Sequence, residues 1–250
     1  METKIVISKG LKLHTRKQRS KLDQDVINEV VTYDHYKLQY LKDKIPYPNI
    51  ILDVGGHIGS FGVYAKSIWP KARLIAIEPN KESCTLYKLN IKENKLKDCE
   101  VIEAGIGYNK KRNILVDGYN ATGGGYLVTD GDPIVKGLNQ DYIVLGEIKL
   151  ITLEEVIEKY NIESIGLAKW DCEGGELDAF KYMLPETAQK MSYLVGEYHY
   201  EDGYFAYKEL VETKAPHIQI GTTLISKVGP FWGIPNNLEE PLLDELLGNP

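Results

Sequence analysis

Cysteine is scarce in this chain of 250 residues, and long apolar runs are missing. The three cysteines, Cys84, Cys99 and Cys172, form no Cys-x-x-Cys pair and have no histidine at a metal-ligand spacing. A disulfide framework and a zinc site are therefore not expected, and the chain fits a reducing, cytoplasmic location. No apolar run approaches the length of a membrane-spanning helix, and no charged-then-apolar leader opens the chain, so we expect no membrane span.

An overall excess of positive charge is also missing. Lys and Arg total 30 against 36 Asp and Glu, for a net charge of −6, which argues against nucleic acid as the main partner. Residues 1–22 are a local exception, because positions 3–22 carry lysines and arginines but no acid. We interpret this segment as a solvated or disordered tail, with a docking arm for an anionic carrier as the alternative. Residues 236–250 form an acidic C-terminal segment whose leucines predict a short amphipathic helix.

Strands and helices alternate along residues 23–235, which we take as one domain. Buried strands are expected at 50–54, 73–77, 100–104, 165–170 and 193–197, with helices at 23–42, 60–68, 82–90, 152–159 and 177–184. This alternation predicts an α/β fold with a doubly wound, mostly parallel sheet. Residues 218–227 and 231–234 read as a C-terminal antiparallel hairpin. Residues 110–149, with alternating polarity and a glycine cluster, predict an insertion of hairpins and a loop that shapes the acceptor site.

The first strong strand ends in a glycine turn with the pattern Asp-x-Gly-Gly-His-x-Gly. Glycine at a strand-to-helix turn lets a ligand approach the backbone. The spacing differs from the Gly-x-Gly-x-x-Gly that surrounds a pyrophosphate, and it suits a nucleoside with an amino-acid end, S-adenosylmethionine. The next strand ends in Glu78, whose carboxylate can accept bonds from both ribose hydroxyls. The expected cofactor contacts are Asp53, Gly55, Gly56, His57, Gly59, Glu78, Pro79 and Asn80.

Carboxylates crowd the end of the fourth strand, at Asp171, Glu173 and Glu176. Like charges this close are costly, so we expect a cation, an ammonium group or a reacting hydroxyl there. Asp171, Glu173 and Glu197 could together hold Mg²⁺, which prefers oxygen ligands. Without a metal, Asp171 or Glu173 could contact the amino group of the cofactor.

Glu197 and His199 lie two apart at the end of the fifth strand and so face the same side. His199 is the candidate general base, because an ordinary imidazole can take a hydroxyl proton near neutrality. Together with Asp171, these two residues form the expected catalytic set.

Taken in order, several motifs resemble FkbM-type methyltransferases. These are Asp53-Val-Gly-Gly-His-Ile-Gly59, Ile77-Glu-Pro-Asn80, Gly105-Ile-Gly107, Thr152-Leu-Glu-Glu155 and Lys169-Trp-Asp-Cys-Glu-Gly-Gly-Glu176. The resemblance implies a Rossmann-like class I fold, S-adenosylmethionine as cofactor and methylation of hydroxyl oxygens on sugars, glycans or polyketides. It also implies cofactor contacts from Asp53, Gly55, Gly59 and Glu78, and a cofactor or substrate role for Asp171. His57 departs from the pattern, since a small polar residue is common at that position.

The leading hypothesis is therefore an O-methyltransferase that acts on a sugar, a glycan or a glycosylated metabolite. Alternatives are a methyltransferase for another small molecule or for nucleic acid, a nicotinamide-dependent oxidoreductase, and a binding module without activity. The sequence lacks the glycine spacing that is typical of a nicotinamide-dependent oxidoreductase. It also lacks a well-placed Tyr-x-x-x-Lys pair, since Tyr33 and Lys37 precede the glycine turn. The sequence leaves the oligomeric state open, a homodimer included.

Overall fold

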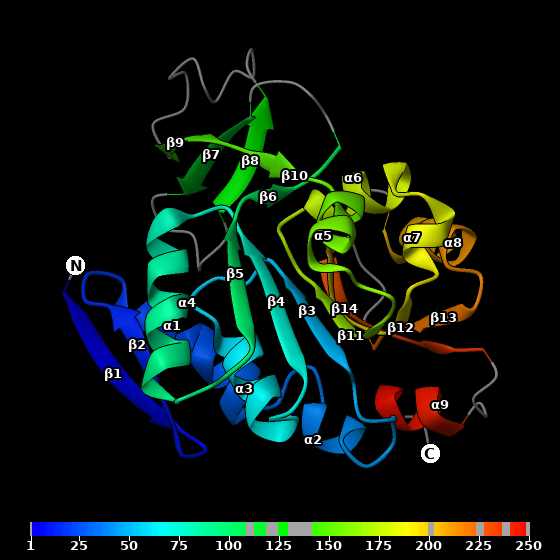
Figure 1. Ribbon diagram of the computed structural model, residues 1–250, viewed down its shortest axis with the longest axis horizontal. Helices are drawn as coiled ribbons and strands as arrows, with labels where there is room; N and C mark the ends of the chain where they lie inside the picture. Colours follow the sequence, from blue (N-terminus) through cyan, green and yellow to red (C-terminus); the bar gives the residue numbers. More distant parts are fainter. Residues whose placement is uncertain are drawn as a thin grey trace.

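The structure is a computed structural model that describes residues 2–108, 113–118, 125–129, 142–199, 203–223, 228–236 and 241–248. Its main sheet has seven strands in the order β13-β14-β12-β11-β3-β4-β5 (Figure 1). Their bounds are β3 (Ile50–Val54), β4 (Arg73–Glu78), β5 (Cys99–Glu103), β11 (Ile165–Trp170), β12 (Met191–His199), β13 (Ile218–Gly221) and β14 (Val228–Pro235).

The strand order makes β3 the centre from which the chain winds in two directions. Strands β4 and β5 follow on one side of β3, strands β11 and β12 lie on the other, and all five are parallel. Strand β14 is antiparallel to both β12 and β13. The expected doubly wound α/β sheet with an antiparallel C-terminal hairpin is confirmed. In such a sheet, ligands bind beyond the carboxyl ends of the parallel strands.

Helices cover both faces of this sheet. Because side chains alternate along a strand, Ile51 joins one apolar cluster while Ile50 and Leu52 join the other. The first cluster includes residues of α3 (Ser60–Ile68), α4 (Lys81–Glu93) and α9 (Pro241–Leu247). The second includes residues of α5 (Leu153–Tyr160), α6 (Gly175–Tyr182), α7 (Pro185–Ala188) and α8 (Tyr204–Lys214). Among the helices that the structure describes, none is both long and apolar enough to cross a membrane.

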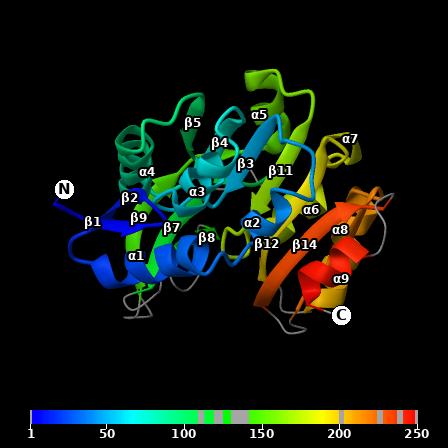
Figure 2. The same cartoon turned by 90° about the horizontal axis from the view of Figure 1, so that it is seen from below.

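The N-terminal segment is an ordered part of the fold. Strands β1 (Thr3–Ser8) and β2 (Leu11–Arg16) pair as an antiparallel hairpin, which Figures 1 and 2 place at the opposite end of the molecule from α9. Leu13 is fully buried in the first apolar cluster, and the main-chain N–H of His14 donates to Asn90 Oδ1 of α4 at 2.6 Å. The interpretation of residues 3–22 as a solvated or disordered tail is therefore wrong, because alternate residues of β2 are apolar and pack against the domain.

The single helix expected at 23–42 is broken into three pieces. These are α1 (Ser20–Ile27), a π-helical turn η1 (Asn28–Thr32) and α2 (Leu38–Leu41). The break lies at Asp34 and Lys37, which both have φ of 55°. The carboxylate of Asp34 accepts the N–H groups of Leu38 and Gln39 at 2.9 and 3.0 Å, so it caps α2 instead of continuing α1. The resulting turn carries residues 29–36 over the ends of the parallel strands.

The insertion contains a small antiparallel sheet, which lies at the upper end of the molecule in Figure 1. Its strands are β7 (Asn113–Gly118), β8 (Gly125–Thr129) and β9 (Tyr142–Ile148), in agreement with the expected hairpins. Glycines 123 and 124 lie outside the described residues. Strands β6 (Gly105–Ile106) and β10 (Leu150–Ile151) pair in parallel and lead into α5, where Thr152 and Glu155 form the expected capping box.

Candidate active site

A cavity of about 200 Å³ lies at the carboxyl ends of β3, β4, β11 and β12. It collects residues from the glycine turn, from the N-terminal segment and from Leu115 of β7. Most residues expected at the site line it: Gly55, Gly56, His57, Glu78, Pro79, Asn80, Asp171, Glu173 and Glu197. Asp53, Gly59 and His199 lie outside this lining.

The glycine turn after β3 needs its glycines for two different reasons. At Gly55, where φ is 77°, an added Cβ would lie 1.8 Å from the carbonyl oxygen of Asp171, so the turn and the end of β11 touch. At Gly56 and Gly59 an added Cβ would instead meet the ring of Tyr87, at 2.6 and 2.2 Å. The glycine pattern therefore reflects packing on Tyr87 of α4 as well as access for a ligand.

Glu78 joins the glycine turn to the end of β4. Its Oε2 accepts the main-chain N–H of His57 at 2.8 Å, and its Oε1 accepts that of Asn80 at 2.7 Å. Burial raises the pKa of Glu78, although these two N–H groups oppose the shift. Each carboxylate oxygen has a second lone pair, so both can still accept a hydroxyl from the cavity.

A buried lysine that we had not assigned to the site fills the space between the turn and β11. Lys169 Nζ donates to the carbonyl oxygens of Gly55 at 2.5 Å and of Val54 and Asp171 at 3.3 Å. It also lies 3.5 Å from carboxylate oxygens of Asp53 and Asp171. Burial alone would lower the pKa of Lys169, but the charges of Asp171 and Asp53 outweigh burial and raise it. Lys169 thus neutralises the carboxylates of β3 and β11.

The carboxylates of Asp53 and Asp171 are held differently. Asp53 is fully buried and accepts the hydroxyl of Tyr87 at 2.7 Å, which ties the end of β3 to α4. Asp171 reaches the cavity, where its Oδ2 accepts the hydroxyl of Tyr36 at 2.8 Å. Burial would raise the pKa of Asp171, but Lys169, His199 and Tyr36 outweigh it and lower it, so the carboxylate is ionised at neutral pH.

His199 lies behind the cavity among carboxylates. Its Nδ1 is 3.4 Å from Glu176, and its Nε2 is 3.6 Å from Glu173 and 3.8 Å from Glu197. Burial disfavours the charged ring, but the nearby carboxylate of Glu176, followed by the charges of Asp171 and Glu173, raises the pKa of His199 to about 9. At neutral pH the ring therefore already carries a proton, which argues against the expected role of His199 as the general base.

This pKa makes stability depend on pH in a defined direction. Because the folded pKa of about 9 exceeds the ordinary value of 6.5, the stabilising contribution of His199 is complete below about pH 6.5 and is lost as pH rises through 9. We expect His199→Gln to lower the free energy of unfolding by up to about 3 kcal/mol at pH 6, and by much less at pH 10. Urea unfolding across this range measures the difference.

His217→Gln is the matched control, because its ring contacts the carbonyl oxygen of Met191 at 2.7 Å instead of a carboxylate. A destabilisation by His199→Gln that stays constant from pH 6 to pH 10 would contradict the assignment.

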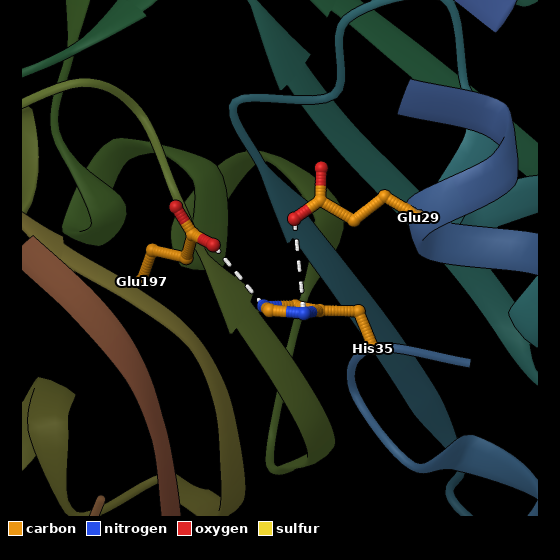
Figure 3. Close-up of side chains that lie close together, drawn as sticks. All are labelled: Glu29, His35 and Glu197. Carbon is orange, nitrogen blue, oxygen red and sulfur yellow. Dashed lines mark ion pairs between the residues drawn. The ribbon is translucent and has the colours of Figure 1, made fainter. Parts of the chain in front are cut away.

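A second histidine, His35, lies between two glutamates that line the cavity (Figure 3). His35 Nε2 is 3.1 Å from Glu197 and its Nδ1 is 3.7 Å from Glu29. Burial would lower the pKa of His35, but the nearby carboxylate of Glu197, followed by the charge of Glu29, outweighs burial and raises it.

The expected magnesium ligands are divided between two clusters of the described residues. Glu197 groups with Glu29 and His35, whereas Asp171 and Glu173 group with His199. The predicted set of Asp171, Glu173 and Glu197 is thus not brought together as one cluster, since a histidine separates its carboxylates. A role for Mg²⁺ stays a prediction.

Sequence reasoning missed the contribution of the N-terminal segment. Arg16, Glu29 and Tyr36 line the cavity, and His35 contacts Glu197 beside it. These residues precede the glycine turn, in a segment for which we expected a tail followed by one helix. Lys169 carried a usable signal, because it is the one charged residue in the otherwise apolar strand 165–170.

The residues of the cavity fit S-adenosylmethionine. Gly55 leaves room where any Cβ would fill the turn, and Glu78 offers two acceptors to a ribose. Ser60 lines the cavity with 2% of its surface exposed, and its Oγ has no hydrogen-bond partner among the described residues. An unpaired buried hydroxyl is costly, and a polar ligand would satisfy it.

Comparisons with known proteins agree with this geometry. A model of the Methyltransferase FkbM domain family matches residues 53–218. The chain is 25% identical over 186 residues to Methyltransferase 1 of Beauveria bassiana (strain ARSEF 2860), covering 69% of this chain and 74% of that protein. It is 25% identical over 183 residues to Methyltransferase sdnD of Sordaria araneosa, covering 65% of this chain and 70% of that protein.

Among solved structures, the fold is similar to that of a SAM-dependent methyltransferase from Agrobacterium tumefaciens. The TM-score is 0.50 at 12% identity, covering 93% of this chain and 69% of that one. The family match spans more than half of the chain and includes the glycine turn, Glu78 and Asp171. The chain therefore belongs to the FkbM family and is a methyltransferase that depends on S-adenosylmethionine.

Proposed function

We propose that the enzyme methylates a hydroxyl oxygen of a sugar, a glycan or a glycosylated metabolite. The observation that carries this proposal is the set of carboxylates on the cavity wall, Glu29, Asp171, Glu173 and Glu197, beside the hydroxyl of Tyr36. Carboxylates accept hydrogen bonds and cannot donate them when ionised, so they suit an acceptor with several hydroxyl groups. The same charges repel a polyphosphate backbone, which supports a small molecule or glycan over nucleic acid.

The proposed mechanism depends mainly on positioning. Bound S-adenosylmethionine supplies an electrophilic sulfonium methyl group. Glu78 holds the ribose end, and the turn at Gly55 fixes the ligand against the end of β11. Holding two reactants in contact with water excluded supplies much of the rate of such a transfer.

We assign to Glu197 the hydrogen bond from the reacting hydroxyl. Glu197 lines the cavity, and its Oε1 is 3.1 Å from His35, whereas the charged His199 lies 3.8 Å from its Oε2. Glu197 can therefore accept the hydroxyl proton while His35 and His199 hold its carboxylate in place. Asp171 acts as a positioning residue, because Tyr36 and Lys169 already engage its carboxylate.

Transfer of labelled methyl groups to a panel of acceptors tests this proposal. The panel contains neutral glycosides, alcohols and phenols without a sugar, and RNA. We expect product from glycosides, and we expect Glu197→Gln to lower kcat by about 100-fold while the Kd for S-adenosylmethionine stays within about twofold. Repeating the assay after chelation, with and without added Mg²⁺, tests the predicted metal.

Glu209→Gln is the control, since Glu209 lies exposed on α8 and should leave both constants unchanged. Methylation of RNA or of sugar-free phenols in preference to glycosides would overturn the proposed acceptor class.

A further inference from the structure

We infer that Arg16, contributed by the N-terminal hairpin, binds the carboxylate at the amino-acid end of S-adenosylmethionine. The inference rests on this cofactor and goes beyond the proposed acceptor. It gives the N-terminal segment a direct part in the site: Arg16 ends β2, lines the cavity and is 5% exposed.

Arg16 is held in place by a buried acid. Its Nε lies 3.1 Å and its Nη2 2.5 Å from Asp23 Oδ1, and its main-chain N–H donates to Asp23 Oδ2 at 2.7 Å. Its Nη2 also lies 2.5 Å from His57 Nε2 in the glycine turn. These contacts use the Nε and Nη2 donors. The two N–H groups of Nη1 have no partner among the residues that the structure describes and remain for a ligand.

Lys169, the second cation that lines the cavity, has no hydrogen-bond donor left for a ligand. An ammonium group has three donors, and Lys169 already faces the carbonyl oxygens of Gly55, Val54 and Asp171. Its charge is moreover shared between Asp53 and Asp171. Of the lysines and arginines that line the cavity in the described part of the chain, Arg16 alone keeps unused donors.

Two further donors beside Arg16 lack acceptors among the described residues. A guanidinium only donates, so His57 Nε2 accepts from Arg16 and the ring proton is on Nδ1. His57 Nδ1 and Ser60 Oγ are both buried without a hydrogen-bond partner in the described part of the chain. Both residues line the cavity, and a carboxylate would satisfy these donors together with Nη1 of Arg16.

The helix that follows the glycine turn also favours a bound anion. Helix α3 begins at Ser60 after Gly59, an N-cap residue without a side chain that could accept the first N–H groups. A helix N-terminus attracts anions through these unpaired groups and its dipole. Buried Ser60 marks this end of α3 as part of the cavity, so the carboxylate subsite combines Arg16, His57, Ser60 and the start of α3.

Comparison of S-adenosylmethionine with its decarboxylated form tests the inference by binding alone. We expect calorimetry on the wild type to show about 10- to 100-fold tighter binding of the intact cofactor, as one or two charge-assisted hydrogen bonds would give. Arg16→Gln should reduce this ratio to within about threefold of unity. Arg16→Lys, which keeps the charge but not the fork of donors, should retain part of it.

Several variants distinguish the loss of the carboxylate contact from a general loss of structure. Arg16→Gln/Asp23→Asn removes the buried pair together, so no charge is left without a partner, and it should lose the preference as well. Glu78→Gln should weaken both ligands by a similar factor, and Lys12→Gln, which removes a charge elsewhere on the hairpin, should change neither.

The inference would be overturned if Arg16→Gln and Arg16→Gln/Asp23→Asn both left the affinity ratio of the two ligands unchanged. It would also be overturned if these variants lost the same affinity for both ligands. Either result would leave the methyltransferase assignment intact. Failure of the wild type to bind either ligand would overturn both.

Discussion

Alanine at Gly55 should abolish measurable binding of S-adenosylmethionine and lower kcat/KM by at least about 100-fold. The added Cβ would lie 1.8 Å from the carbonyl oxygen of Asp171, and no side-chain rotation can relieve a clash with the main chain. The turn and the end of β11 would have to separate, which moves both walls of the cavity. Backbone strain at φ of 77° adds about 1–3 kcal/mol to the loss of stability. Calorimetry and urea unfolding measure the two effects.

Gly10 provides a closely matched control for this substitution. Its φ is 79°, so alanine suffers similar backbone strain, but no described residue lies within 4 Å of its added Cβ. We expect Gly10→Ala to lose about 1–3 kcal/mol of stability and to keep full cofactor affinity. Similar affinities in the two variants would show that the close approach of the turn to β11 is unimportant.

Methionine at Lys169 should destabilise the protein by about 3–5 kcal/mol. Methionine fills a similar volume but leaves Asp53 and Asp171 without the cation that lies 3.5 Å from each. Removing one partner of a buried ion pair is costly because the remaining charge is uncompensated. Urea unfolding at pH 7 measures the loss. Acid should reduce it, because protonation of the two carboxylates removes the stranded charge.

The control for Lys169 is the exposed pair formed by Lys12 and Glu93 at 3.5 Å. The Lys12 side chain is 56% exposed, so Lys12→Met should change stability by less than about 1 kcal/mol. The double variant Lys169→Met/Asp53→Asn should recover part of the loss. A loss below about 1 kcal/mol for Lys169→Met would show that solvent already screens these carboxylates.

Elements set by local patterns could be predicted from the sequence. The apolar strands at 50–54 and 165–170 and the helix at 60–68 agree with β3, β11 and α3, and the capping box at Thr152 does begin α5. The break between α1 and α2 could not be read from apolar spacing, because the carboxylate of Asp34 caps the second helix within a continuous apolar pattern. Helix α8 was missed because its apolar residues form only a weak stripe in the sequence.

The residues of the candidate site also fall into a group that local patterns predict and a group that they do not. Residues beside a strand end, such as Gly55, Glu78 and Asp171, could be predicted because parallel strands end at the same edge of the sheet. Arg16 and Glu29 could not, since a hairpin and a π-helical turn bring them to the cavity from distant parts of the chain. The raised pKa of His199 could not be predicted either. It depends on Glu176, whose buried carboxylate accepts a main-chain N–H of the loop that precedes α6 and lies beside the ring.

The ring of Tyr87 limits which residues several neighbouring glycine positions can accept. Added methyl groups at Gly56, Gly59 and Gly62 would each overlap this ring, and its hydroxyl donates to Asp53. These three glycines and the tyrosine therefore form one unit for sequence variation. A larger residue at Gly56 or Gly62 becomes acceptable only after the aromatic ring has been replaced by something smaller, so exchanges at these positions should occur together among related chains. Gly59, where φ is 90°, is held by its backbone conformation as well.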